Sequence, residues 1–173
     1  MNGTGVAANN GLKQKICSAI PQGRMTSAGG SVGLIGGETG SLQQVVNYNS
    51  GEVSNFASGG VQGGWNGGAS ASGSVGLIFQ GNGQFTNSDF SGPFSNVTVS
   101  AREGPGGSVS WASNGVKVVS GSVSATLIPG PPTVSYSYTW TTKPKPAGNI
   151  WTNLSNPLGL ADLALYGLRQ LCK

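Results

Sequence analysis

The sequence predicts an all-β domain, an antiparallel barrel or strongly bent sheet of roughly eight strands, with a short N-terminal helix and a C-terminal helix. Side chains alternate in a two-residue rhythm over most of the chain, which is typical of strands with two unlike faces. Gly and Asn turn signals divide this region into about eight blocks. Only 8% of the 173 residues are charged, against ~25% in an ordinary soluble domain. The surface should therefore be hydrated mainly by Ser, Thr, Asn and Gln.

The length suits one domain, which we expect to cover residues 1–173. Its expected parts are an N-terminal segment (1–25), a β-barrel (26–142), a linker (143–155) and a C-terminal helix (156–173). In the first part, apolar residues at helical spacing predict a helix over Asn9–Ala19. In the last, Leu residues at helical spacing predict a helix over Asn156–Leu171, with Pro157 in its first turn.

Between the helices, turn signals bound each expected strand. The strands are Thr26–Gly36, Ser41–Asn49, Val53–Gly64, Ala69–Phe79, Phe94–Arg102, Ser108–Ala112, Val116–Ile128 and Thr133–Thr142. The clearest is 69–79, where one face holds Ala69, Ala71, Gly73, Val75, Leu77 and Phe79, and the other Ser70, Ser72, Ser74, Gly76 and Ile78. Closure of these strands into a barrel would leave no exposed edge. A two-sheet sandwich is the alternative.

Composition removes several classes of function. The chain contains no histidine, so it lacks the usual general base and the commonest zinc ligand. No metal site, cofactor or nucleotide-binding motif is expected, and scattered cations without a basic stripe argue against nucleic acid. Glu38 and Glu52 are the remaining candidates for paired carboxylates, as in glycoside hydrolysis, or else are solvated turn residues. We expect a protein that is not an enzyme.

The two strand faces raise the question of which one points inward. A soluble barrel has an aliphatic interior, whereas a membrane barrel faces lipid with its apolar side and has a polar lumen. The alternation is the same in both cases. Five aromatic residues are candidate binding or membrane-interface residues, or else belong to the core or the barrel mouth: Trp65, Trp111, Tyr136, Tyr138 and Trp140.

Cys17 and Cys172 lie on either side of the whole barrel region. A disulfide between them would join the N-terminal segment to the C-terminal helix and close a very long loop, which in the chain-entropy model stabilises by about 4–5 kcal/mol. Two buried free thiols are the alternative, because Cys packs as a small apolar residue.

The stretch 45–68, Val-Val-Asn-Tyr-Asn-Ser-Gly-Glu-Val-Ser-Asn-Phe-Ala-Ser-Gly-Gly-Val-Gln-Gly-Gly-Trp-Asn-Gly-Gly, resembles Gly-rich C-terminal regions of RHS/YD-repeat bacterial proteins. The resemblance covers about a third of the chain and maps no catalytic motif onto it. It implies a secreted or injected effector domain that is released from a larger protein and has an immunity partner. Met1 to Asn10 is polar and does not resemble a signal peptide, which is compatible with an excised domain.

The leading hypothesis is a non-enzymatic, secreted bacterial toxin or effector-type β-barrel domain that acts at membranes by forming pores. Its expected partners are membrane lipid and an immunity protein. Its expected location is extracellular or membrane-associated, as part of a larger parent protein. The alternative is a soluble β-barrel module that recognises a glycan or a protein through exposed aromatics. The sequence leaves the oligomeric state open.

Overall fold

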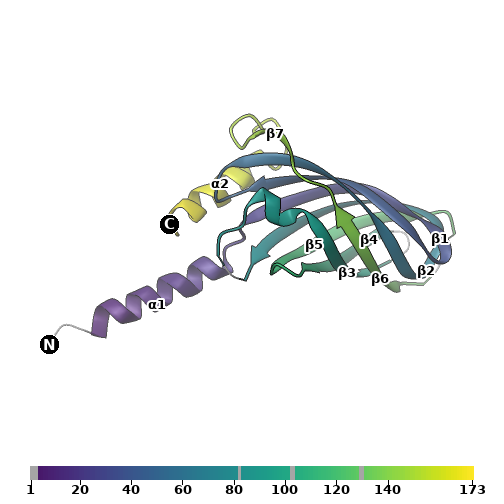
Figure 1. Cartoon of the computed structure of the whole chain (residues 1–173), viewed down its shortest axis with the longest axis horizontal. Coiled ribbons are helices and arrows are strands. Elements are labelled where there is room, and N and C mark those ends of the chain that lie inside the picture. Colours follow the sequence, from purple (N-terminus) through teal and green to yellow (C-terminus); the bar gives the residue numbers. More distant parts are fainter. Residues whose placement is uncertain (1–3, 82, 102–103, 129–130) are drawn as a thin grey trace.

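One antiparallel sheet accounts for most of the chain in the computed structural model. The structure describes residues 4–81, 83–101, 104–128 and 131–173, without the side chains of 4–10, 34 and 65–67. In chain order the elements are α1 (Thr4–Ala19), β1 (Gly23–Asn47), β2 (Glu52–Gln80), the 3-10 helix η1 (Asn87–Phe90), β3 (Gly92–Ser100), β4 (Gly104–Ala112), β5 (Val116–Thr126), β6 (Thr133–Thr141), β7 (Lys145–Asn149) and α2 (Gly159–Gln170). Both helices lie at one end of the barrel, which we call the helical end (Figure 1).

The long strands β1 and β2 each fold back on themselves. A Cβ placed on Gly29 would overlap the carbonyl oxygen of Gly40, although eleven residues of straight strand would span about 36 Å. β1 therefore has two arms, 23–33 and 36–47, and its reversal uses positive φ angles at Gly33 (+144°) and Gly36 (+79°). In β2 the change of direction between the arms 52–63 and 68–80 likewise uses positive φ angles, at Gly64 and Gly68. Only glycine adopts such angles without strain.

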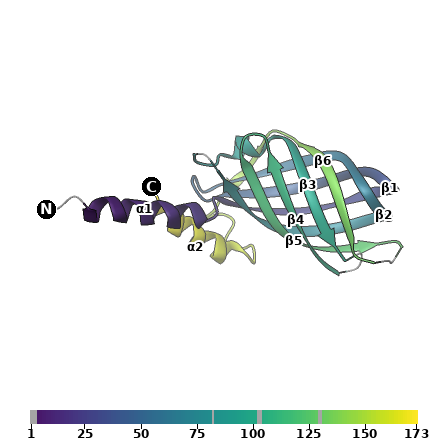
Figure 2. The same ribbon diagram turned by 90° about the horizontal axis from the view of Figure 1, so that it is seen from below.

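These four arms close the barrel with β3 to β6. Arm 36–47 pairs with arm 52–63, and the pairing continues through β6, β3, β4 and β5 to arm 68–80, which pairs with arm 23–33. The result is a closed antiparallel barrel of eight strands with β7 as an extra strand. The predicted barrel is confirmed, and the sandwich alternative is wrong. Figure 2 shows the strands crossing the barrel obliquely.

The strand registers set the width of the barrel. When the pairing is followed from strand to strand once around the barrel, it returns to β1 about ten residues further along the chain. A stagger of this size tilts the strands by about 40° relative to the barrel axis. A barrel of eight strands has an interior just wide enough for its own side chains. Small residues must therefore fill most of it.

Several boundaries differ from those that the sequence predicts. α1 begins at Thr4 instead of Asn9, and α2 begins at Gly159 instead of Asn156. β4 begins at Gly104 instead of Ser108, and Pro105 is tolerated there because it lies next to the strand end. The predicted linker contains β7, which pairs with β2 from Glu52 to Asn55.

Two separate apolar clusters are buried at the helical end. The first lies inside the barrel and consists of Met25, Val45, Phe56, Ile78, Phe85, Phe90, Phe94, Val116 and Val118. The second lies between the turn that joins β1 to β2 and the helix α2. It consists of Val46, Tyr48, Val53 and Ile150, with Leu165 and Tyr166 packed against it. Because arm residues alternate, Val45 faces inward and Val46 faces α2. α2 therefore covers the outer wall at this end only.

A buried ion pair fixes α2 to the wall. Arg24 donates from Nε to Oδ1 of Asp162 and from Nη2 to Oδ2, both at 2.7 Å, and the two residues are 4% and 1% exposed. Tyr48 donates its hydroxyl proton to Oδ1 at 2.8 Å. Burial alone would lower the pKa of Arg24, but the hydrogen bond and charge of Asp162 raise it. Burial, then the Asp162 hydrogen bond, raises the pKa of Tyr48, so its phenol stays a donor.

We expect Asp162→Asn to lower the free energy of unfolding by about 3–5 kcal/mol, because it leaves the Arg24 charge buried without its partner. A urea titration followed by tryptophan fluorescence measures this change. The double variant Arg24→Met, Asp162→Leu should recover most of the loss, since apolar residues can replace a buried pair. A loss below about 1 kcal/mol in Asp162→Asn would contradict the prediction.

Candidate functional site

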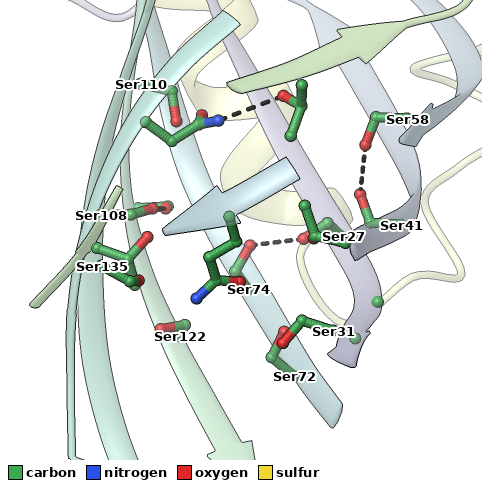
Figure 3. A pocket seen from close by; sticks show the side chains of 18 of the residues that line it. Ser27, Ser31, Ser41, Ser58, Ser72, Ser74, Ser108, Ser110, Ser122 and Ser135 are labelled. Carbon is green, nitrogen blue, oxygen red and sulfur yellow. Dashed lines mark hydrogen bonds between the residues drawn. The ribbon is translucent and has the colours of Figure 1, made fainter. Parts of the chain in front are cut away.

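A polar lumen runs through the part of the barrel away from the helices. It forms a cavity of about 220 Å³ that is lined mainly by serine and threonine, with amide groups from Gln43, Gln62 and Asn96. None of the described lining residues is charged. Figure 3 shows ten serines of this lining: Ser27, Ser31, Ser41, Ser58, Ser72, Ser74, Ser108, Ser110, Ser122 and Ser135. The volume is far above the ~10–15 Å³ that one water needs, so the lumen can hold several waters.

Many of the lumen hydroxyls bond to each other across neighbouring strands. Ser27 Oγ lies 2.7 Å from Ser74 Oγ, and Ser41 Oγ lies 2.8 Å from Ser58 Oγ (Figure 3). Ser108 and Ser120 make the same contact at 2.6 Å. Each pair stands directly opposite in the register, which is where cross-strand side chains interact. The hydroxyl lining thus satisfies much of its own hydrogen bonding.

The outer wall of the same strands is apolar and exposed. In β5, Ser120, Ser122 and Ser124 line the lumen, whereas Val119 and Val123 face outward, with Val123 66% exposed. In 69–79 the serine face is the inner one. Every barrel strand contributes at least one exposed large apolar residue to this wall, including Val32, Leu42, Val61, Val75, Leu77, Val99, Val109, Val119, Val123 and Val134. The usual polarity of a water-soluble barrel is inverted along this length.

Charged residues are nearly absent from this wall. Lys117 is the second residue of β5 and Glu52 is the first of β2, so both mark the helical end. Among the described residues, Glu38 of β1 is the one exposed charged residue of the wall that lies away from the helical end. At a tilt of about 40°, the stretch from Lys117 to Leu127 spans about 20–25 Å along the barrel axis. That is close to the height of the apolar band on transmembrane barrels, ≈25 Å.

An apolar plug closes the lumen at the helical end. The ring of Phe90 lies 5.2 Å from that of Phe56 and 5.1 Å from that of Phe94, centroid to centroid. Phe85 and Phe90 come from the segment between β2 and β3. Gln22 holds this segment by accepting from the Phe85 amide at 2.7 Å, and Asn47 donates to the Phe85 carbonyl at 3.0 Å. The lumen is therefore polar along most of its length and blocked at one end.

The predicted aromatic residues are spread along the wall, with Trp111 and Trp140 near the helical end. Trp111, Tyr136, Tyr138 and Trp140 are all exposed and outward-facing, and the rings of Tyr138 and Trp140 meet edge to face at 4.6 Å. Tyr138 and Trp111 stand on either side of Ser95 of β3. Trp65 pairs with Ile35 in the sheet, and its side chain lies outside the described residues.

The two candidate carboxylates are not brought together. Both are exposed, and Glu38 pairs with Val61 while Glu52 pairs with Asn149 at the helical end. The partner of Glu38, Val61, lies nine residues along β2 from Glu52, so the two carboxylates are separated by about 30 Å along the strand direction. No group of three or more His, Cys, Asp or Glu that could hold a metal ion is found among the described residues. The geometry gives a carboxylate pair no support.

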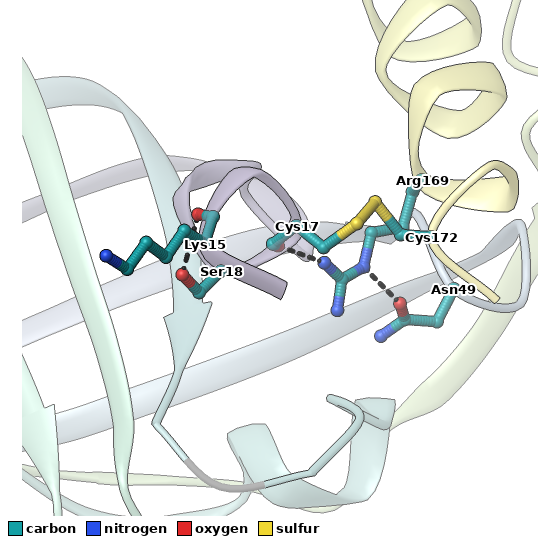
Figure 4. The surroundings of a disulfide bond; sticks show 6 residues. All are labelled: Lys15, Cys17, Ser18, Asn49, Arg169 and Cys172. Atoms are coloured by element: carbon teal, nitrogen blue, oxygen red, sulfur yellow. Dashed lines mark hydrogen bonds between the residues drawn. A yellow bond between two sulfur atoms is a disulfide. The ribbon is translucent and has the colours of Figure 1, made fainter. Parts of the chain in front are cut away.

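Of the two states that the sequence leaves open for the cysteines, the structure has the disulfide. Cys17 of α1 is bonded to Cys172 with an S–S distance of 2.02 Å (Figure 4). Arg169 of α2 reinforces the link by donating to the Cys17 carbonyl at 2.7 Å and to Asn49 Oδ1 at 2.8 Å. Among residues 11–19 of α1, whose side chains the structure describes, most are exposed, including Leu12 and Ile16. α1 is thus held mainly through its last turn.

No family model, no curated protein and no solved structure matches this chain. No helix within the described part of the chain is long and apolar enough to cross a bilayer. The site is therefore interpreted from its own geometry. Its parts are the hydroxyl lumen, the phenylalanine plug and the apolar wall. Sequence alternation indicates the two faces, but Lys117 and the plug residues Phe85 and Phe90 carry no sequence motif and were not predicted as functional.

Replacement of Phe90 by Ala should lower the free energy of unfolding by about 3–5 kcal/mol, because it removes a ring that touches two others in the plug. Phe79→Ala is the matched control, since Phe79 is half-buried on the outward face of the same barrel end. Chemical denaturation of both variants checks this. An equal loss in the two variants would show that the plug is not packed as described.

Proposed function

We propose that this domain is a membrane-inserted β-barrel with its apolar wall against lipid and its serine lumen shielded from it. The single observation that carries the proposal is the inverted polarity of 69–79 and β5, with Ser inward and Val or Leu outward. Water-soluble monomers rarely expose contiguous apolar patches above a few hundred Å². Here exposed aliphatic side chains surround the barrel. Lipid is the environment in which this surface is stable.

The backbone supports the same proposal. In hydrocarbon every amide and carbonyl group must be paired within the protein, and a closed barrel is the one sheet architecture without a free edge. The eight strands form a closed antiparallel barrel. Their tilt of about 40° lies within the range of transmembrane barrels. Glu38 is the one exposed charge of the described wall away from the helical end, and it lies near the strand reversal where the band ends.

The polar lumen supports the further proposal that the inserted barrel is a pore that is closed at one end. A path through the barrel would be lined by hydroxyls, which substitute for water without carrying charge. The plug of Phe85 and Phe90 blocks this path. Displacement of the segment that carries them would open a narrow passage for water and small ions. An effector domain with this action fits the resemblance of 45–68 to RHS/YD-repeat proteins, and the secreted toxin role and the immunity partner depend on that resemblance.

A second candidate is a soluble module that binds a glycan or a protein. One observation favours it: Trp111 of β4 and the pair Tyr138 and Trp140 of β6 are exposed on the two strands that flank β3. Aromatic faces and polar edges suit such ligands. This candidate requires that the wild-type protein does not bind vesicles and that Trp111→Ala abolishes ligand binding. Flotation with vesicles therefore decides between the two functions.

Wild-type protein should float with liposomes, and Val123→Lys should reduce the bound fraction strongly. A lysine in the lipid-facing band costs about 2–4 kcal/mol near the midplane, whereas an exposed substitution in a water-soluble protein stays within about 0.5 kcal/mol. Ser113→Lys, in the exposed turn before β5, is the matched control and should bind like wild type. If wild-type protein stays with the soluble fraction, the membrane function is refuted.

The double variant Phe85→Ala, Phe90→Ala should admit protons and potassium ions to vesicles that the wild-type protein keeps sealed, because it removes two rings of the plug. The narrow barrel should still retain a large dye such as calcein. Internal pH and dye release are measured in the same vesicles, and Val99→Ala, at an exposed position of β3 outside the plug, serves as the control. Circular dichroism confirms that each inserted variant is folded. Equal ion flux in all three proteins argues against a lumen pathway.

A further inference from the structure

We infer that the helical end of the barrel binds anionic phospholipid headgroups through a collar formed by Phe79, Trp111, Lys117, Trp140 and Lys143. This inference rests on the proposed membrane insertion and adds to it a partner and an orientation. The residues of this basic-aromatic collar come from β2, β4, β5, β6 and the segment that follows β6.

The collar residues reach the same end of the barrel on different strands. Phe79, Trp111 and Trp140 are each the penultimate residue of β2, β4 and β6, and these strands all end at the helical end. Lys117 is the second residue of β5, which starts there. In the registers Lys117 stands opposite Phe79 on one side and opposite Trp111 on the other. One cation is therefore flanked by two outward-facing aromatic rings.

This combination has a specific chemical preference. Tryptophan rings settle at the boundary between hydrocarbon and headgroups, and lysine extends its ammonium group from that level towards phosphate. Lys117 and Lys143 are exposed. No carboxylate of the described residues forms an ion pair with either of them, since the one such pair is that of Arg24 and Asp162. Their charges are therefore available to a lipid phosphate.

Charge asymmetry between the two ends supports an anionic leaflet as the partner. The helical end also carries Lys145 and Lys173, against Glu52 and Asp89, and the Asp89 carboxylate accepts hydrogen bonds from Thr86. Lys13 and Lys15 lie on α1, which extends away from the barrel (Figure 1). At the opposite end the wall's one charge among the described residues is that of Glu38. Each basic residue near an anionic surface contributes about 1 kcal/mol, or about fivefold in affinity. The helical end should therefore face the anionic headgroups.

The test compares flotation with vesicles of phosphatidylcholine alone and with vesicles that contain 30% phosphatidylglycerol. The wild-type protein should prefer the anionic vesicles about tenfold or more, and high salt should reduce that preference. The double variant Lys117→Gln, Lys143→Gln should lose most of the preference while it still binds phosphatidylcholine. Lys13→Gln, Lys15→Gln removes the same charge from exposed α1 and should keep most of it.

The outcomes separate the two proposals. Binding to neither vesicle refutes the membrane function and the collar together. Equal binding of wild-type protein to both vesicles refutes the collar alone, as does an equal loss in the two double variants, which would show attraction by net charge only. A selective loss in Lys117→Gln, Lys143→Gln, with both proteins folded by circular dichroism, supports the collar.

Discussion

The closed register of eight tilted strands is the constraint on which the rest of this structure depends. Once the barrel closes at this stagger, its interior has room mainly for small side chains, and alternation sends the aliphatic residues of the same strands outward. Ser120 and Val119 illustrate the division within one strand. Where the interior does hold a large ring, at Phe94, the register partner on β4 is the small residue Ala112. The polar lumen and the apolar wall thus have the same geometric cause.

Glycine makes the closure possible at the two strand reversals. Gly33 and Gly36 turn β1 back on itself, and the resulting hairpin lies between the two arms of β2. A Cβ on Gly37 would overlap the carbonyl oxygen of Val32, so substitution there would separate the arms. Without this inserted hairpin, β2 could not pair with β5 through one arm and with β6 through the other. The high glycine content therefore serves a particular strand order.

The sequence predicts the strands well because alternation is a local signal, and all eight expected strands are found in the barrel. It does not predict which face points inward, because Ser70 to Phe79 alternates identically in either arrangement; closure and register decide that. It also misses the Arg24–Asp162 pair, whose members lie 138 residues apart and belong to no motif. The disulfide stays an open alternative in the sequence for the same reason, since two cysteines carry no information on their distance. The plug was missed because phenylalanines in a Gly- and Asn-rich loop resemble ordinary loop residues.

The parts of the helical end are connected through the turn between β1 and β2. Asn47 and Asn49 of this turn donate to the Phe85 carbonyl and so hold the plug segment. The same turn receives hydrogen bonds from α2 and the C-terminus, with Arg169 donating to the Asn49 side chain and Lys173 to its carbonyl. The Arg24–Asp162 pair and the disulfide in turn fix α2 and α1 beside it. Because these contacts share one turn, movement of α2 away from the wall would remove part of the support of the plug.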